Sequence, residues 1–295
     1  MPSRSELIRI AGLTLRVRYA DESLRRPLSP TMSRFAIAPD GFANTDIVMD
    51  IVIEPMDAPL PAPGKLLFDS GAVWHAYETD GGFRIDCHSE IFGSVPYKAA
   101  LFSSDLSHAR ILVRRETFNE EMHPLDYPLD ELMVAHLLGR GRGVELHSCG
   151  IIDRDGRGQL FVGQSGAGKS TTARVWLAEG DYEIVSDDRV IIRFIDGEWR
   201  MFGTPWHGEA ELSSASSAPL AAIHLLDQAK RTELVALPPA QAAARLFSCS
   251  FPPFYDAEAL AATLGILDRL VAEVPVRALR FVPDRSVIDC IQSAA

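Results

Sequence analysis

Gln159-Leu-Phe-Val-Gly163-Gln-Ser-Gly-Ala-Gly168-Lys169-Ser170-Thr171-Thr172 is the stretch from which the fold of this chain can be argued. Residues 163–170 fit the pattern G-x-x-x-x-G-K-[ST], in which a glycine-rich turn points successive backbone N–H groups at a phosphate. The apolar residues 160–162 predict a buried strand before this turn, and residues 171–178 predict a helix that stops near Gly180. This order favours nucleoside triphosphate binding over the alternative, a glycine-rich turn that fits the pattern by chance.

The predicted phosphate contacts all lie in this loop and in the first turn of the helix that follows. They are Gly163, Ser165, Gly166, Ala167, Gly168, Lys169, Ser170 and Thr171. Glycines let the backbone approach an anion without a β-carbon in the way, and the helix N-terminus adds the positive end of its dipole. Because the lysine of the pattern serves the terminal phosphates and the serine offers its hydroxyl to Mg²⁺, the expected cofactors are ATP and Mg²⁺.

The composition is that of an ordinary globular protein. Of the 295 residues, 47% are hydrophobic and 23% are charged, and this length allows one large domain or two ordinary ones. The net charge of −11 argues against a nucleic-acid partner. Because no signal-peptide pattern follows Met1 and no run of eighteen apolar residues occurs, we expect a cytoplasmic protein without a membrane partner. The four cysteines have no C-x-x-C spacing, which favours reduced thiols over disulfides or zinc.

The chain is expected to divide into a β-rich domain, residues 1–122, and a catalytic domain, residues 123–295. In the first domain, the predicted strands are residues 7–19, 46–54, 73–78, 83–87 and 109–114, and the predicted loops are residues 25–44 and 55–64. Thr79-Asp-Gly-Gly82 predicts a hairpin turn. No catalytic pattern occurs in this domain, so its task stays open, with substrate selection as one candidate.

The second domain predicts a mixed α/β fold. Its predicted helices are residues 128–138, 171–178, 239–247, 257–274 and 286–292. Its predicted strands are residues 144–153, 159–162, 182–186, 190–194, 199–202 and 221–226, with a closing strand at 279–282. A tight turn at residues 154–158 predicts that a hairpin leads into the phosphate-binding loop. Ras-like and ATPase domains differ, because there this strand begins a βαβ unit.

Two adjacent carboxylates follow the loop at the end of a short apolar run. They are Asp187 and Asp188, and carboxylates near one metal can divide the work, one holding the ion and the other accepting a proton. The alternative is an exposed Asp-Asp turn. His147 lies on the strand expected to pair with the one entering the loop. Since adjacent strands lie about 4.8 Å apart, it could reach the phosphates or Asp187, although a structural histidine is equally compatible.

Three stretches of the chain together resemble the C-terminal catalytic domain of HPr kinase/phosphorylase. They are Leu146-His147, the loop at residues 163–170, and Val185-Ser-Asp-Asp-Arg-Val190. That domain is related to ATP-dependent phosphoenolpyruvate carboxykinase, so the resemblance implies a P-loop fold of this type. It covers residues 147–193 best. It implies that Lys169 contacts phosphates, that Ser170 and Asp188 hold Mg²⁺, that Asp187 is the acid/base at a seryl hydroxyl, and that His147 supports metal and phosphate.

The resemblance is incomplete at the loop that engages the protein substrate. The family's glycine-containing acidic and basic signature is missing, and Gly203-Thr-Pro-Trp-His-Gly-Glu209 stands in its place. Over its whole length the chain is similar to divergent HPr-kinase-like proteins found beside peptide-modification genes, including kinases of lasso-peptide precursors. His207, Glu209 and Glu211 are candidates for substrate contact or a second metal position. The alternative is a surface loop in which Trp206 is a packing anchor.

Three functions stay open on these residues. The resemblance implies a kinase that phosphorylates a serine of a peptide or small protein. A second candidate is a kinase of a small hydroxyl metabolite such as free serine. The third is a regulator that binds ATP without transfer, and plain ATP hydrolysis is also compatible with the site. The acceptor, phosphorolysis and a homo-oligomeric state are left open by the sequence.

Overall fold

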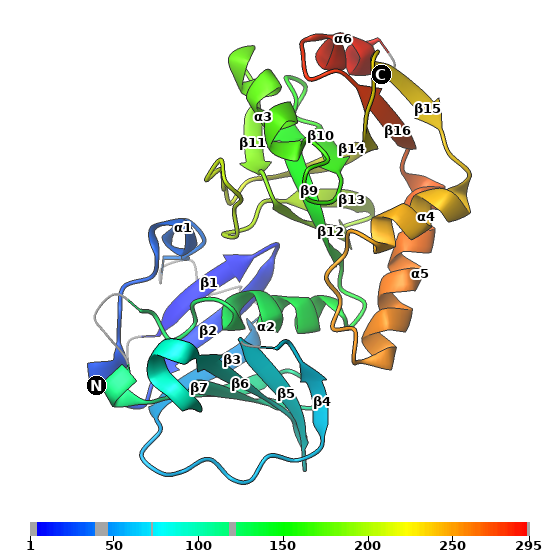
Figure 1. Cartoon of the computed structure of the whole chain (residues 1–295). Coiled ribbons are helices and arrows are strands. Elements are labelled where there is room, and N and C mark those ends of the chain that lie inside the picture. The colour runs from blue at the N-terminus through cyan, green and yellow to red at the C-terminus, as the bar shows by residue number, and fades with distance from the viewer. Residues whose placement is uncertain (1–4, 39–46, 72, 118–121, 294–295) are drawn as a thin grey trace. The chain divides into compact units, whose positions relative to one another are not determined.

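The computed structural model describes residues 5–38, 47–71, 73–117 and 122–293 (Figure 1). Contacts divide the chain into two compact units, residues 1–134 and residues 135–295. Within the described residues each unit contains one eight-stranded β-sheet, and with the helices the fold is mixed α/β, as expected. The domain boundary between residues 122 and 123 stays a prediction. The N-terminal pattern at residues 1–4, loop residues 39–44 and strand residue 46 lie outside the described residues.

The sheet of the first unit has the strand order β1-β2-β3-β8-β7-β6-β5-β4. Its strands are β1 Glu6–Ile10, β2 Leu13–Tyr19, β3 Ile47–Pro55, β4 Leu66–Asp69, β5 Trp74–Thr79, β6 Gly82–Ser89, β7 Gly93–Ser103 and β8 His108–Val113. The helical segments are η1 Glu22–Leu24, α1 Pro30–Ser33, η3 Glu90–Phe92 and η4 Arg115–Thr117, and the helix α2 Leu129–Leu138 spans the boundary between the two units. Exposed and buried residues alternate at the start of β8, as the sequence pattern predicts.

Three local predictions for this unit need correction. The stretch 7–19 is a hairpin, because Ala11 and Gly12 adopt φ values of 50° and 76° and turn the chain between β1 and β2. The predicted loop 25–44 contains the short helix α1, which the side chain of Ser29 caps at its N-terminus. Strands β4 and β7 were not predicted, since their buried and exposed residues do not alternate regularly.

A buried lysine holds the segment that leads out of the first sheet. Lys98 on β7 is 1% exposed, and its ammonium group donates hydrogen bonds to the carbonyl oxygens of Asp126 and Tyr127. Burial lowers the pKa of Lys98. The side chain therefore satisfies backbone carbonyls that have no strand partner at this point of the chain.

Replacing Lys98 by methionine is expected to lower the free energy of unfolding by about 2 kcal/mol, because buried carbonyl oxygens lose their donor. Urea unfolding measures the change. The control is Lys65→Met, which removes an exposed lysine and should leave stability within about 0.5 kcal/mol of the native protein. Equal stability of the two variants would contradict a structural role for Lys98.

The sheet of the second unit has the strand order β10-β9-β12-β13-β14-β16-β15, with β11 paired to β9. Its strands are β9 Val144–Ile152, β10 Gly158–Val162, β11 Glu183–Ser186, β12 Arg189–Ile195, β13 Glu198–Phe202, β14 Ser217–Gln228, β15 Glu233–Ala236 and β16 Val276–Phe281. Its further helices are α3 Lys169–Ala178, α4 Pro239–Phe247, α5 Ala257–Glu273 and α6 Ser286–Gln292.

Strand β10 pairs with a different strand on each side, in opposite orientations. It is antiparallel to β9, which confirms the predicted hairpin, and parallel to β14 on its other side. The predicted closing strand at 279–282 is β16, but it lies between β14 and β15. Strand β15, which is short and has no fully buried residue, has no counterpart among the predicted strands.

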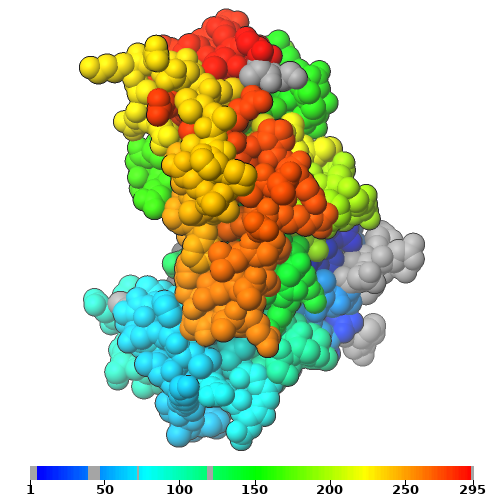
Figure 2. Space-filling model, turned by 90° about the vertical axis from the view of Figure 1, so that its right-hand side faces the viewer, coloured from blue at the N-terminus to red at the C-terminus, as the bar shows by residue number. Residues whose placement is uncertain are grey.

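Helices cover this sheet on two faces (Figure 1). Leu246 of α4 and Leu267 of α5 pack in one apolar cluster with Leu160 and Val162 of β10. Phe161 points the other way and packs in a second cluster with residues of α3 and α6. Figure 2 shows α5, in orange, along the surface of this unit.

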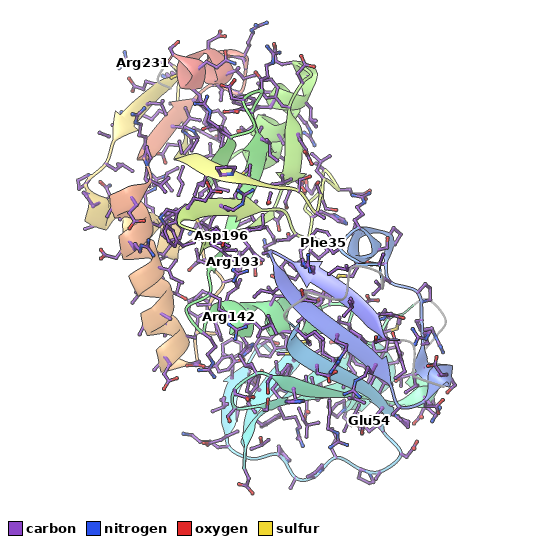
Figure 3. The ribbon with its side chains drawn as sticks, turned by 180° about the vertical axis from the view of Figure 1, so that it is seen from behind. Phe35, Glu54, Arg142, Arg193, Asp196 and Arg231 are labelled. Atoms are coloured by element: carbon purple, nitrogen blue, oxygen red, sulfur yellow. The ribbon has the colours of Figure 1, made fainter. Side chains whose placement is uncertain are left out.

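The pairing of β9 with β12 is reinforced beyond its last ladder residue. The Nε atom of Arg193 on β12 donates a hydrogen bond of 2.7 Å to the carbonyl oxygen of Arg142, which precedes β9 (Figure 3). Burial and the neighbouring charge of Arg142 lower the pKa of Arg193.

Among the helices of the described residues, none is both long and apolar enough to cross a membrane.

Candidate functional site

The glycine-rich loop, residues 163–168, connects the end of β10 to the start of α3 as predicted. Gly166 and Gly168 have φ values of 79° and 108°, which residues other than glycine rarely adopt. A β-carbon on Gly168 would lie 2.7 Å from a ring carbon of Phe281, and one on Gly163 would lie 2.6 Å from Cβ of Ala167. The local backbone and its packing therefore both require glycine here.

Lys169 folds back over this loop. It is the first residue of α3, only 6% exposed, and its Nζ atom donates to the carbonyl oxygens of Gly163 at 2.9 Å and Gln164 at 3.2 Å. Burial lowers the pKa of Lys169, whereas the nearby carboxylate of Asp188 opposes this shift. The positive charge is thus held at the loop and lies within electrostatic reach of Asp188.

The two adjacent aspartates have different surroundings. Asp187 is 0% exposed, and its two oxygens accept backbone N–H bonds from Gly208 at 2.9 Å and from Ala210 at 3.0 Å. Asp188 is partly exposed and lies 2.8 Å from Nε2 of His147. Its other oxygen pairs with the guanidinium group of Arg189. Asp187 therefore holds a loop, and Asp188 faces the histidine.

Strand pairing brings His147 to this position. His147 lies opposite Arg189 in the β9–β12 ladder, and its carbonyl oxygen accepts the N–H of Gly163 at 3.2 Å. The neighbouring Ser148 N–H donates to the carbonyl oxygen of Asp188 at 3.0 Å. His147 was expected to reach the phosphates or Asp187, and its observed partner is the neighbouring carboxylate, Asp188.

The charge of Asp188 is set by these neighbours. Burial by itself would raise the pKa of Asp188, but the hydrogen bond from His147 and the positive charges of Arg189 and Lys169 outweigh it and lower the pKa. Asp188 is therefore a carboxylate at neutral pH. In turn, the guanidinium group of Arg189 lies 4.0 Å from the ring centre of Phe251.

A hollow of about 280 Å³ lies beside the loop. Gly163 and Gln164 border it on one side, and the C-terminal part of α4 and the residues after it contribute Arg245, Ser248 and Cys249. Arg245 is held by Asp227 at 2.8 Å. The hollow offers room for a ligand next to the backbone of the glycine-rich loop.

The stretch 203–211 forms a loop between β13 and β14 that is fastened to the aspartate turn. Besides the two bonds to Asp187, Thr204 Oγ1 donates to the carbonyl oxygen of Arg189 at 2.7 Å. His207, Glu209 and Glu211 are exposed on this loop. They lie on the same loop as the anchored amides, and their predicted roles stay predictions.

Sequence reasoning missed three residues that complete this arrangement. Arg189 and Phe251 flank the Asp188–His147 pair, and Gln228 at the end of β14 donates to the carbonyl oxygen of Gly166 at 2.9 Å. Arg189 directly follows the aspartates, which was the only local signal. The other two depend on strand pairing and on the loop after α4, which no short pattern reveals.

The residues predicted to hold Mg²⁺ are compatible in kind with that ion. The hydroxyl group of Ser170 and the carboxylate of Asp188 are oxygen donors, and Mg²⁺ takes few protein ligands besides water and phosphate oxygens. Among the described residues no group of three His, Cys, Asp or Glu side chains forms a metal cage. The donors therefore fit an ion bound together with a nucleotide.

Replacing Gly168 by alanine should destabilise the protein by more than the strain of the positive φ angle alone. The expected loss of unfolding free energy is about 2–4 kcal/mol, because a left-handed residue and an overlap with Phe281 are combined. Gly141→Ala is the matched control, since Gly141 has a φ of 74° but no atom within 4 Å of its β-carbon position. Thermal unfolding of both variants tests this, and equal losses would contradict the packing argument.

Fold and site together define a mixed α/β protein in which a glycine-rich loop meets a buried lysine and an Asp–His pair. The family model of the SynChlorMet cassette protein ScmC matches residues 116–257. This segment contains the loop, His147 and both aspartates. The comparison with curated proteins found no match.

Proposed function

We propose that this protein is an ATP- and Mg²⁺-dependent kinase that transfers the γ-phosphoryl group to a serine hydroxyl of a peptide or small protein. The proposal includes a P-loop catalytic domain of the phosphoenolpyruvate carboxykinase/HPr kinase type in the second unit. The observation that carries it is the convergence of Lys169 and the Asp188–His147 pair beside one glycine-rich loop. Binding of a triphosphate and removal of a proton are the two needs of phosphoryl transfer.

The geometry favours His147 as the group that accepts the proton. When Nε2 of His147 carries its proton towards Asp188, the second ring nitrogen is left as an acceptor, and Asp188 fixes this tautomer. The serine hydroxyl would give its proton to this nitrogen while its oxygen bonds to the γ-phosphorus. The bond from that phosphorus to the ADP oxygen breaks in the same step.

The remaining groups would bind and orient the nucleotide. The N–H groups of the loop and the ammonium of Lys169 would contact the phosphates in place of the carbonyl oxygens that Lys169 now contacts. Mg²⁺, held by Ser170 and Asp188, would neutralise phosphate charge. Asp187, which the resemblance implies as the acid/base, is fully buried and both its oxygens accept from the backbone of Gly208 and Ala210, whereas Asp188 is partly exposed. We therefore assign Asp187 to loop positioning.

The ScmC family model matches the segment that contains this site, and its name specifies no reaction. The proposal therefore rests on the arrangement of the site.

A small hydroxyl metabolite such as free serine is the second candidate acceptor. The hollow beside the loop has about 280 Å³, which is small for an acceptor larger than a metabolite. Incubation with γ-labelled ATP and either a serine-containing peptide library or a metabolite set separates the two candidates. Labelling of neither acceptor class by a protein that binds ATP would contradict transfer and support an ATP-binding regulator.

A further inference from the structure

A second hollow in the same unit lies at the opposite end of β10 from the glycine-rich loop. It has a volume of about 160 Å³, and its polar lining consists of Arg157, Gln159, His224 and Arg277. Arg157 directly precedes β10 and Gln159 lies at its start, whereas Gly163 follows its end. Gly163 lies four residue steps along the strand from Gln159, which is roughly 13 Å. This hollow is therefore distinct from the candidate transfer site.

Three neighbouring parallel strands, β10, β14 and β16, supply Gln159, His224 and Arg277 to the lining (Figure 1). Phe161 of β10 lies opposite His224 of β14, and His224 lies opposite Arg277 of β16. This register places one arginine beside the histidine, and the turn before β10 supplies a second. Among the described residues, no carboxylate lines the hollow, so its lining is cationic.

Arg277 and Arg157 differ in how their charges are balanced. Arg157 is paired with Asp155 at 2.9 Å and with Asp153 at 3.4 Å. Arg277 forms no ion pair with a described residue. A cation without a counterion beside a partly enclosed space attracts an anion.

His224 has a ring nitrogen that can accept a hydrogen bond but receives none from a described residue. It is 3% exposed, and its Nε2 atom lies 3.0 Å from Oε1 of Gln159, whose carboxamide nitrogen donates to Asp153. Nε2 of His224 must therefore carry the proton. Its Nδ1 atom is buried and has no hydrogen-bond partner among the described residues. Burial, and then the charge of Arg277, lower the pKa of His224 to about 3, so the ring stays neutral and Nδ1 stays an acceptor.

We infer that this hollow binds a small oxyanion that also carries a hydroxyl group, such as hydrogenphosphate or the phosphate of a small metabolite. The anionic oxygens would pair with Arg277 and Arg157, and the O–H would donate to Nδ1 of His224. An adjoining hollow of about 270 Å³ shares Arg157 and Gln159 and is lined by Trp176, whose buried indole N–H has no partner in the part of the chain that the structure describes. It offers room for the rest of a phosphorylated ligand.

The test uses inorganic phosphate as the probe and the Lys169→Met protein as the background, since that change weakens anion binding at the glycine-rich loop. Calorimetric titration is expected to show one remaining phosphate site. Arg277→Gln in this background should weaken it at least about tenfold, because a charge-assisted hydrogen bond is lost. The matched control is Arg280→Gln on the same strand, where Arg280 lies outside the hollow and pairs with Glu233 at 3.4 Å. It should bind phosphate as the background protein does.

Sulfate tests the role of His224, because at neutral pH it has the charge of hydrogenphosphate and no hydroxyl group. It should bind about 3- to 10-fold more weakly, the value of one hydrogen bond. The ring ¹⁵N resonances of His224 should shift with phosphate in the Arg280→Gln protein and stay unchanged in the Arg277→Gln protein. Absence of a phosphate site in the Lys169→Met background, or equal binding by both arginine variants, would overturn the inference. Equal sulfate and phosphate affinity would overturn the contact with His224. None of these results depends on whether the protein is a kinase.

Discussion

Lys169→Met is expected to lower phosphoryl transfer about 10³-fold and to weaken ATP binding by at least about tenfold. In the structure the ammonium group already lies against the loop carbonyls of Gly163 and Gln164. A bound triphosphate offers the ammonium group stronger acceptors in the same place. Lys169 therefore contributes most to ATP affinity when phosphate oxygens replace the carbonyl oxygens as its acceptors. Methionine preserves the length and packing of the side chain but has no charge.

Arg174→Met is the matched control for this change. Arg174 also lies on α3 but is exposed, so its loss should leave ATP affinity within about twofold. Affinity is measured by titration with a non-hydrolysable ATP analogue, and transfer by single-turnover incorporation of label. Equal effects of the two substitutions would show that helix charge, and not the contact at the loop, governs binding.

His147→Gln is expected to reduce the rate of transfer about 10³-fold while ATP affinity changes less than about threefold. Glutamine retains a donor towards Asp188 but cannot accept the proton of a serine hydroxyl. Asp188→Asn should slow transfer to a similar extent, because asparagine no longer fixes the tautomer of the imidazole. It should also weaken binding of the Mg²⁺–ATP complex, since a proposed Mg²⁺ ligand loses its charge. The double substitution should be little worse than either single one, since the two side chains act as a unit.

Additive losses in this double-mutant cycle would contradict the assignment of His147 and Asp188 to one function. Asp187→Asn provides the decisive comparison, because the resemblance to HPr kinase implies that Asp187 is the acid/base. If Asp187 positions the loop, its substitution should accelerate amide hydrogen exchange at Gly208 and Ala210 and raise the acceptor KM. Residual turnover at saturating acceptor should persist. Complete loss of turnover with unchanged exchange would restore Asp187 as the base.

Local patterns were sufficient for the parts of the fold that depend on neighbouring residues. The β9–β10 hairpin, the glycine-rich loop and α3 follow from turn residues, apolar runs and the backbone freedom of glycine, all within residues 144–178. The terminal helix α6 was predicted with the bounds that the structure shows. The hairpin at residues 7–19 was missed because its turn, Ala11-Gly12, sits inside an uninterrupted alternation. Strand β15 was missed because it buries no residue completely.

Tertiary structure decided which side chains share a site. Asp187 and Asp188 are chemically equivalent in sequence, yet the turn between β11 and β12 buries Asp187 against backbone amides and turns Asp188 towards His147. No sequence pattern separates the two, because the difference comes from a loop more than fifteen residues downstream and from the β9–β12 register. The cationic hollow around Arg277 arises in the same way, from parallel strands that only the folded sheet brings together. The sequence by itself determined the kinds of chemical group available, and long-range pairing determined their partners.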